Sequence, residues 1–412
     1  MSERHSILVI GTFDTKAEEL AFLCERIRAQ GANVVTMDVS VLGEAGMAVD
    51  VSKHDVARAA GRTIEDAIGA ADENEAMQIM ASGATTLCAN LVSQGRVAAM
   101  VGLGGTMGTD LLLDCASTLP LGVPKVIVST VAFSPLIPPD RLAPDLQMVL
   151  WAGGLYGLNA ICRSSLAQAA GAVVGAARAA EPPRFDRPVI GMTSLGSSCL
   201  RYMTLLQEPL RERGFDLAVF HSTGMGGMAF EAMAEKGVFA AVLDLCLQEV
   251  ANGFAGSLVH SGAARLSSAG AAGVPQIVAP GCSDLVDFAG WQTVPAPYAD
   301  RPFHDHNRLI RSTTLTRDER RALMRHVAER LGAAKGPVHF VLPLRGVEEW
   351  DRTGEPAHDP EALAAMVDEA RRAIGATVPL TEVDAHINDQ AFANAVLAIL
   401  DGWIADGTID LR

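Results

Sequence analysis

The sequence predicts an α/β protein of two domains, each built on a parallel β-sheet. Short apolar and β-branched runs alternate with helical patterns, which is the arrangement of parallel βαβ units. The chain has 412 residues, which is too many for one ordinary core. Residues 179–188 contain three prolines and little periodicity, which indicates a linker. We therefore expect two Rossmann-like, doubly wound parallel-sheet domains over residues 1–182 and 183–412, with a cleft between them.

The individual elements follow from local patterns. In the helix expected over residues 75–94, apolar side chains recur at spacings of three and four and form one stripe. Strands are expected near residues 7–10, 34–38, 98–101, 126–129, 189–193, 217–220, 239–243, 276–279 and 339–342. Helices are expected near residues 16–30, 75–94, 228–236, 263–272, 317–331, 360–374 and 389–405. Residues 189–193 and 213–220 echo residues 9–12 and 30–37, so the halves are either topological copies or two uses of a common unit.

Charge and composition restrict the partners. The formal net charge is −15, with 33 basic and 48 acidic residues, and no basic run is longer than a pair. Sequence-independent binding to nucleic acid or to an anionic membrane needs clustered cations, so we expect neither, and a small-molecule ligand instead. The chain shows no secretory signal and no apolar stretch of membrane-spanning length. We expect a cytoplasmic protein.

The seven cysteines are scattered and form no C-x-x-C pair. We therefore predict neither a disulfide framework nor a zinc site, and expect most of the thiols to be buried as small hydrophobes. Cys199 and Cys282 lie in glycine- and serine-rich turns and are the two for which another role stays open. His304 and His306 flank an acidic residue, but their spacing within a proline-rich loop does not single out a metal site, and no metal ligand is assigned.

The most informative stretch is residues 100–110, where an apolar strand pattern passes through four glycines into a helical pattern. Glycines let the backbone approach a ligand closely, and the first free N–H groups of a helix point at an anion. The stretch lacks the ending of a P-loop and the spacing of the dinucleotide fingerprint. It is therefore either a tight connection or a phosphate-binding turn. The glycines are Gly102, Gly104, Gly105 and Gly108.

The turn after the first strand offers a second contribution to a nucleotide site. Gly11 and Thr12 can present amides and a hydroxyl at the same sheet edge. Asp14 or Thr15 can cap the following helix, and Glu18 has the spacing of a capping box with Thr15. Asp38 ends the second strand, where acceptors for ribose hydroxyls often lie.

A second glycine-rich turn stands at an expected strand end in the second half, at the place equivalent to that of the first glycine-rich turn. His221 is a candidate general base, and Glu231 is a candidate catalytic residue one turn into the helix that follows. The turn itself carries the expected substrate-binding residues Ser222, Thr223, Gly224, Gly226 and Gly227.

Further polar residues fall at the ends of expected strands in the second half. One cleft could bring together Asp244, Glu249 and Arg265 as catalytic groups, with Asp284 as a substrate-binding residue. Arg311 could pair with a phosphate or carboxylate of the substrate.

Several long motifs, in this order, resemble the uncharacterised protein family 0261, whose plant members include the ATP-binding domain of a tobamovirus-resistance protein. The motifs are residues 11–16, 102–109, 220–227 and 343–347, so the resemblance spans nearly the whole chain. It implies two α/β domains, an ATP-type nucleotide in the first, and homodimers. The nucleotide-site assignment that the resemblance transfers covers Gly11, Thr12, Asp14, Gly102, Gly104, Gly105, Thr106, Gly108 and Thr109. Residues 129–134 and 245–249 depart from the family pattern, which concerns the substrate end.

Three hypotheses for function follow. The first is an ATP-binding enzyme, with Mg²⁺ considered as the accompanying ion, that acts on a small anionic substrate by phosphoryl or nucleotidyl transfer or by ligation. The second is a nucleotide-sugar transferase or epimerase, which rests on fold-level analogy. The third is a non-catalytic binding protein that is controlled by a nucleotide.

Overall fold

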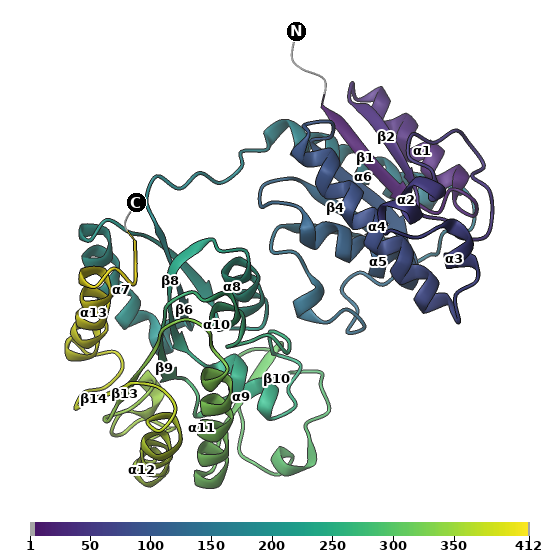
Figure 1. Ribbon diagram of the computed structural model, residues 1–412. Helices are drawn as coiled ribbons and strands as arrows, with labels where there is room; N and C mark the ends of the chain where they lie inside the picture. The colour runs from purple at the N-terminus through teal and green to yellow at the C-terminus, as the bar shows by residue number, and fades with distance from the viewer. Residues whose placement is uncertain (1–4, 411–412) are drawn as a thin grey trace. The chain divides into compact units, whose positions relative to one another are not determined.

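The computed structural model describes residues 5–410 and divides into two compact units (Figure 1). Unit 1 extends to Arg184 and unit 2 begins at Phe185, close to the expected boundary after residue 182. Each unit is a mixed α/β fold around a parallel sheet, so the predicted fold class is confirmed.

The sheet of unit 1 has five parallel strands in the order β2-β1-β3-β4-β5. The chain leaves β1 for the edge strand β2 on one side and then continues from β3 on the other side. The sheet therefore has a topological switch point between β1 and β3, where ligands of such sheets bind at the carboxyl ends of the strands. The strands are β1 (Ser6–Gly11), β2 (Asn33–Asp38), β3 (Ala99–Gly104), β4 (Lys125–Ser129) and β5 (Leu146–Leu150).

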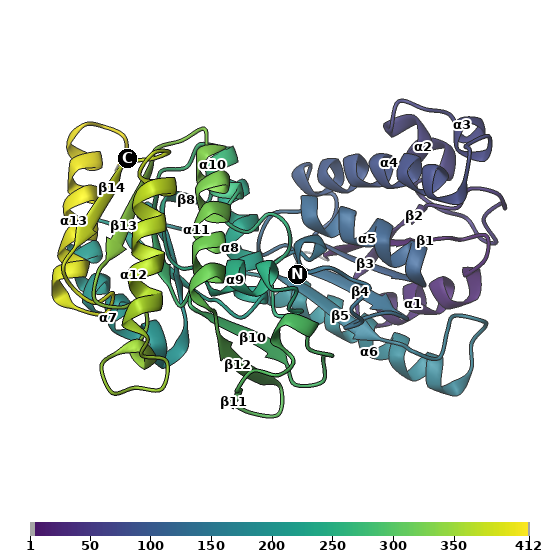
Figure 2. The same ribbon diagram turned by 90° about the horizontal axis from the view of Figure 1, so that it is seen from below.

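Helices cover both faces of this sheet (Figure 2). Two of them pack on one face and four on the other, each through an apolar stripe that joins the buried side of the strands. The first face carries α1 (Ala17–Ala29) and α6 (Ala160–Ala179), and the second carries α2 (Lys53–Ala59), α3 (Ile64–Ile68), α4 (Glu73–Ser93) and α5 (Thr106–Thr118). The sequence patterns did not predict β5, whose residues are only partly buried, or the short helices α2 and α3.

The sheet of unit 2 has six parallel strands in the order β14-β13-β9-β8-β6-β7. Read from β7, the first five strands repeat the strand order of unit 1, and β14 extends the sheet by one strand. The interpretation of the halves as topological copies is therefore confirmed at the level of strand order. The strands are β6 (Val189–Ser194), β7 (Asp216–His221), β8 (Phe239–Cys246), β9 (Gln276–Gly281), β13 (Val338–Pro343) and β14 (Leu380–Val383).

Unit 2 also contains helices on both faces and an inserted antiparallel sheet. The helix expected over residues 263–272 is shorter in the structure, because Leu266 has a φ of 64° and ends any helix there. One face carries α7 (Gly196–Glu212) and α13 (Gln390–Ala405). The other face carries α8 (Met225–Glu235), α10 (Ser268–Ala272), α11 (Arg317–Gly332) and α12 (Pro360–Glu369), with α9 (Gln248–Phe254) beside the insertion. The insertion follows β9 and consists of β10 (Leu285–Ala289), β11 (His304–Asp305) and β12 (Ile310–Thr314).

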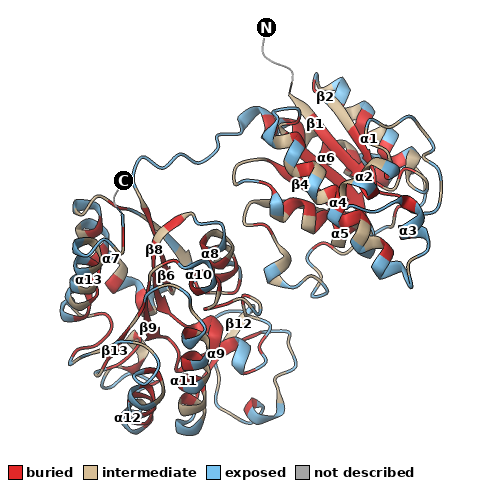
Figure 3. Cartoon of the chain, viewed as in Figure 1, coloured by how far each residue is buried: buried red, intermediate tan, exposed pale blue. Residues whose placement is uncertain are grey.

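The central strands of both sheets are buried, while the outward faces of the helices are exposed (Figure 3). In the described part of the chain, no helix combines the length and apolar composition that crossing a membrane requires.

Candidate functional site

Unit 1 has a pocket of about 660 Å³ at the carboxyl ends of β1 and β3. This is the switch point of the sheet, and the volume lies within the range of small-molecule sites. The turn after β1 and the glycine-rich turn after β3 both line the pocket, as the sequence predicted for a nucleotide site. From the expected set, the lining residues are Gly11, Thr12, Asp14, Gly104, Gly105, Thr106 and Gly108.

Of the three helices that begin at the pocket, α1 and α5 have no side-chain cap, whereas α4 is capped by Asp72. The first helical turn of α5 follows Gly105, and that of α1 follows Lys16; neither residue accepts a hydrogen bond from the helix through its side chain. Each of the other four helices of unit 1 has a capping residue whose side chain accepts a backbone N–H of the first turn. The capping residues are Ser52, Thr63, Asp72 and Asn159. Uncapped first-turn N–H groups and the helix dipole favour an anion.

The glycines of the first turn have different roles. A Cβ at Gly102 would lie 2.2 Å from Leu112 Cδ2, and a Cβ at Gly104 would lie 2.7 Å from Gly108 Cα. Both glycines therefore let α5 pack closely against β3. A Cβ at Gly105 would meet only the Thr130 hydroxyl, at 3.9 Å, so this glycine faces open space.

The turn after β1 adds polar groups to the pocket. The hydroxyls of Thr12 and Thr15 are 3.1 Å apart. Asp14 accepts the Gly43 N–H through Oδ2, whereas its Oδ1 is buried and has no hydrogen-bond partner among the described residues. Lys16 lines the pocket with its ammonium 4.9 Å from the ring centre of Tyr156. The capping box expected between Thr15 and Glu18 is wrong, because the helix begins after Lys16 instead.

Two residues expected to contact the nucleotide, Asp38 and Thr109, do not line this pocket. Asp38 is buried, and its Oδ1 accepts the N–H groups of Phe13 at 3.1 Å and Ser40 at 3.0 Å. It thereby ties the turn after β1 to the turn after β2. Thr109 is buried as well and shares a hydrogen bond of 2.7 Å with the Ser129 hydroxyl.

The remaining wall of the pocket is mainly apolar and continues into a second cavity of about 400 Å³. The two cavities share residues from the first turns of α4 and α5, Glu73, Met77, Thr106 and Met107. Sequence reasoning missed the apolar wall, because its side chains come from four separate segments. They include Leu42, Ile68, Met77 and Met80. Lys16 was not predicted as a site residue, although it is the last residue of the predicted turn.

The second glycine-rich turn does not occupy the same place in unit 2. It follows β7, the edge strand that corresponds to β2, so the predicted equivalence with the turn after β3 is wrong. Its amides are also already used. Glu249 Oε1 accepts the N–H of Gly224 at 2.6 Å and that of Gly227 at 3.0 Å. A Cβ at Gly227 would lie 1.8 Å from Glu249 Oε2, so this glycine makes room for the carboxylate. At Gly226 a Cβ would lie 1.9 Å from the carbonyl oxygen of His221.

The structure brings together four of the predicted catalytic residues around one guanidinium. Arg265 donates to Glu249 Oε2 at 2.9 Å, to Asp244 Oδ1 at 2.7 Å and to Glu231 Oε1 at 3.2 Å. All four side chains are at most 4% exposed. Burial raises the pKa of Glu231, and it raises the pKa of Glu249 to about 7. We interpret these residues as a structural network that holds the second turn.

The other predicted residues of unit 2 lie outside this network. His221 is exposed, and its Nδ1 accepts the Gly196 N–H at 3.4 Å. Asp284 is buried with its carboxylate 3.7 Å from Arg320 Nη2, and burial raises its pKa to about 6. Arg311 pairs with Asp305 at 3.4 Å on the inserted sheet. Thr223 is half-buried, while Ser222 is fully buried.

The fold and the pocket define a class: proteins with two parallel α/β units, the first of which has a polar and apolar pocket at its switch point. Within that class, the chain belongs to the uncharacterised protein family UPF0261. Residues 5–182 match the N-terminal domain of the family and residues 187–404 its C-terminal domain.

Among relatives, a UPF0261 protein of Brucella melitensis is 55% identical over 403 residues, which cover 98% of this chain and 96% of that protein. The ToMV resistance protein Tm-1 of Solanum lycopersicum is 28% identical over 423 residues, which cover 95% of this chain and 55% of that protein. A solved UDP-GlcNAc 2-epimerase from Neisseria meningitidis is 8% identical over 71% of this chain and 85% of its own, with a TM-score of 0.23. That score is too low to support a functional argument.

Proposed function

We propose that unit 1 binds an ATP-type nucleotide, with its phosphates at the first turns of α1 and α5. The observation that carries this proposal is the contrast between these two uncapped helices and the four capped helices of the same unit. A phosphate would accept the free first-turn N–H groups, and Lys16 would add a positive charge from the pocket wall. The family resemblance supports ATP as the nucleotide.

The base would lie against the apolar part of the pocket. Met77 and Met80 of α4 lie on this wall with Leu42 and Ile68. Flexible thioethers and branched aliphatic side chains suit the flat face of a purine. The pocket thus has one end for an anion and one end for an apolar ring.

The polar end also fits a magnesium ion that accompanies the phosphates. Mg²⁺ prefers oxygen ligands and binds through one or two carboxylates together with phosphate oxygens. Asp14 offers a buried carboxylate oxygen without a hydrogen-bond partner among the described residues, and the Thr12 hydroxyl lies in the same turn. These two residues would hold the ion, which would neutralise phosphate charge.

For the activity, we propose phosphoryl or nucleotidyl transfer, or ligation, to a small anionic substrate. The second cavity of unit 1 supports this, since it adjoins the nucleotide pocket at Thr106 and is lined by Arg141, which pairs with Asp110 and Asp114 and keeps 36% of its side chain exposed. The second candidate is a non-catalytic, nucleotide-controlled binding protein. The burial of Glu249 and Arg265 favours that candidate, because it removes these groups from contact with any substrate.

Calorimetric titration of the full chain with Mg-ATP tests the binding proposal. We expect saturable heat with the native protein and at least about tenfold weaker binding by Gly105→Val, whose side chain would enter the open space at the turn. Gly175→Val is the matched control, because Gly175 lies in α6 and a Cβ there would have no neighbouring atom within 4 Å. Equal affinity of both variants, or stabilisation by UDP-sugars and not by ATP, would refute the proposal.

Turnover separates the two candidates. The full chain is incubated with Mg-ATP and a panel of small carboxylates and phosphates, and nucleotide products are quantified. Substrate-dependent formation of ADP or AMP that is lost in Gly105→Val supports transfer or ligation. Tight binding of ATP without turnover over the whole panel supports the non-catalytic candidate.

A further inference from the structure

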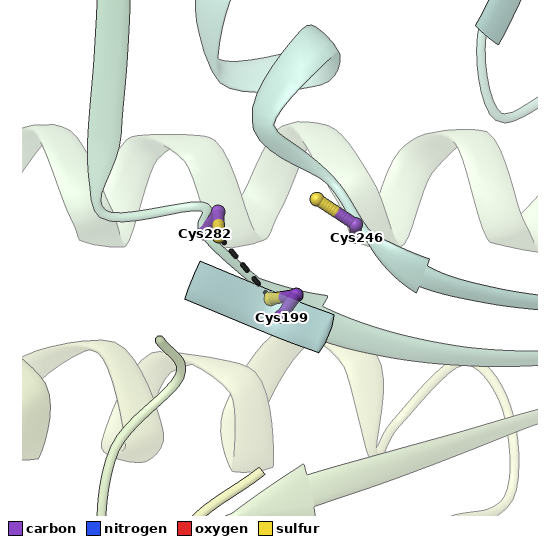
Figure 4. A group of neighbouring side chains, drawn as sticks. All are labelled: Cys199, Cys246 and Cys282. Atoms are coloured by element: carbon purple, nitrogen blue, oxygen red, sulfur yellow. Dashed lines mark hydrogen bonds between the residues drawn. The ribbon is translucent and has the colours of Figure 1, made fainter. Parts of the chain in front are cut away.

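Three buried cysteines meet at the carboxyl edge of the sheet of unit 2 (Figure 4). Cys199 lies in the first turn of α7 after β6, Cys246 ends β8, and Cys282 follows β9. These strands are neighbours in the sheet, and β6 and β8 flank the switch point of unit 2. Side chains far apart in the sequence thus converge where ligands of such sheets bind.

The sulfur atoms are close enough to share one ion. All three lie within 4.8 Å of one another, and Cys199 Sγ is 3.2 Å from Cys282 Sγ. All three residues are completely buried, and their thiols are free. A zinc–sulfur bond is about 2.3 Å long, so tetrahedral ligands would have sulfurs roughly 3.8 Å apart. The closest pair therefore needs to separate by only about half an ångström.

The backbone departs from regular geometry at two of the three residues. Cys199 interrupts α7 with a φ of −129° and a ψ of 15°. Cys282 has a φ of 51°, in the left-handed region that residues other than glycine seldom adopt. Such positions cost about 1–3 kcal/mol and cluster at functional sites.

A buried hydroxyl lies next to the cluster. Ser222 follows β7, is fully buried, and has its hydroxyl beside the sulfur of Cys246. A thiol is a weak hydrogen-bond partner, so a ligand at the cluster would offer this hydroxyl a stronger one.

We propose that Cys199, Cys246 and Cys282 bind one thiophilic metal ion, Zn²⁺ or Cu⁺, through three thiolates. Soft thiolate ligands select these ions over Mg²⁺ and Ca²⁺. On binding, each S–H bond breaks, its proton goes to the buffer, and a sulfur–metal bond forms. For Zn²⁺ three protons leave and two positive charges arrive, so the site loses one unit of charge.

Unit 1 contains a matched control. Cys88 and Cys115 are buried and interact with each other. Among the described residues, no third cysteine, histidine or carboxylate joins this pair to form a group of three. For Zn²⁺ and Co²⁺, a pair of thiols lacks the third protein ligand that such sites contain. Cys88→Ser therefore removes a buried thiol from a touching pair without touching the proposed site.

The experiment uses the full chain, purified under reducing conditions and free of oxygen, and titrated with Zn²⁺ or Cu⁺ against a chromophoric chelator. Co²⁺ serves as a probe, since thiolate ligation gives a sulfur-to-cobalt charge-transfer band. We expect about one ion per chain with that band, and the same in Cys88→Ser. In Cys246→Ser and Cys246→Ala we expect at least about hundredfold weaker binding and loss of the band. Comparison of the two titrations identifies which ion binds more tightly.

Three results would overturn the proposal. They are no ion bound by the reduced native chain, unchanged binding in both Cys246 variants, and a Cys199–Cys282 disulfide in place of metal. Circular dichroism of both variants verifies that they fold. The metal site and the nucleotide pocket lie in different units, so failure of either proposal leaves the other standing.

Discussion

The two glycine-rich turns of this chain differ in whether a side chain of the protein already binds their N–H groups. We call the turn of unit 1 the open turn and the turn of unit 2 the filled turn. In unit 1, α5 begins after Gly105 without a side-chain cap, beside a pocket of about 660 Å³. In unit 2, α8 begins after Gly224, and the Glu249 carboxylate already accepts the N–H groups of Gly224 and Gly227. Glycines at a strand-to-helix turn therefore do not by themselves indicate a ligand site. What matters is whether a carboxylate of the protein already fills the position of the anion.

The filled turn also explains the surrounding charges. A buried carboxylate needs a cation, and Arg265 supplies it for Glu249. Arg265 in turn satisfies Asp244 and Glu231, and Thr193 donates its hydroxyl to Asp244. The network is thus an internal counterpart of the anion that we propose for unit 1.

The largest expected effect is the loss of stability when the charge network of the filled turn is disrupted. Arg265→Met leaves three buried carboxylates without their cation, so we expect a loss of about 3–5 kcal/mol in the free energy of unfolding of unit 2. Urea unfolding of the full chain measures this loss. Arg213→Met is the control, because its partner Asp401 is half exposed and the pair contributes at most about 1 kcal/mol. Equal losses in the two variants would contradict the structural role of the network.

The second prediction concerns a substitution that gives the open turn a carboxylate of its own. Gly105→Asp places a carboxylate at the position before α5, where φ is −75° and ψ is −153°, close to cap geometry. We expect unit 1 to gain about 0.2–0.5 kcal/mol in stability while Mg-ATP affinity falls at least about tenfold. Thermal unfolding and calorimetry measure the two changes. Gly105→Asn separates capping from charge, and tighter ATP binding by the aspartate variant would exclude a phosphate at this turn.

The third effect concerns the pH dependence of the filled turn. The pKa of Glu249 is about 7 in the folded chain and about 4.5 in the unfolded chain, so the folded chain holds an additional proton between these values. The free energy of unfolding therefore falls as pH rises from about 4.5 to about 7, by about 1–3 kcal/mol. Glu249→Gln reduces this slope in urea titrations at several pH values, whereas exposed Glu208→Gln leaves it unchanged. A slope that persists in Glu249→Gln would assign the proton to another group.

The smallest effect tests the charge at the open turn. Lys16→Met removes a cation from the pocket wall, so we expect about tenfold weaker binding of Mg-ATP and a weaker dependence of affinity on salt. Calorimetry at two ionic strengths measures both. Lys335→Met makes the same change of net charge at an exposed position of unit 2 and should leave binding unchanged. If both variants lose affinity equally, the effect of Lys16 is only a long-range one.

Local patterns predicted most of the fold. Alternating strands and helices gave two parallel sheets, because burial on both faces makes such strands continuously apolar. The half-exposed edge strand β5 lacks that pattern, and its residues were left unassigned. The linker between residues 179 and 188 was visible because prolines remove helical periodicity.

The candidate site was predicted less completely. The turns after β1 and β3 were found, because their glycines are local features. The occupation of the second turn was not, since Glu249 lies 25 residues after Gly224 and reaches it only through the folded sheet. The third thiol of the cluster was missed for the same reason: Cys246 ends an ordinary apolar strand, and only the sheet order places it beside Cys199 and Cys282.

A crystal structure of the full chain with Mg-ATP tests the central claim most directly. The account predicts phosphate oxygens within hydrogen-bond distance of the first-turn N–H groups of α5 and of Lys16, with Glu249 unmoved in the second turn. Phosphate bound at residues 221–227 in place of Glu249, or a first turn of α5 with no nucleotide beside it, would contradict the claim.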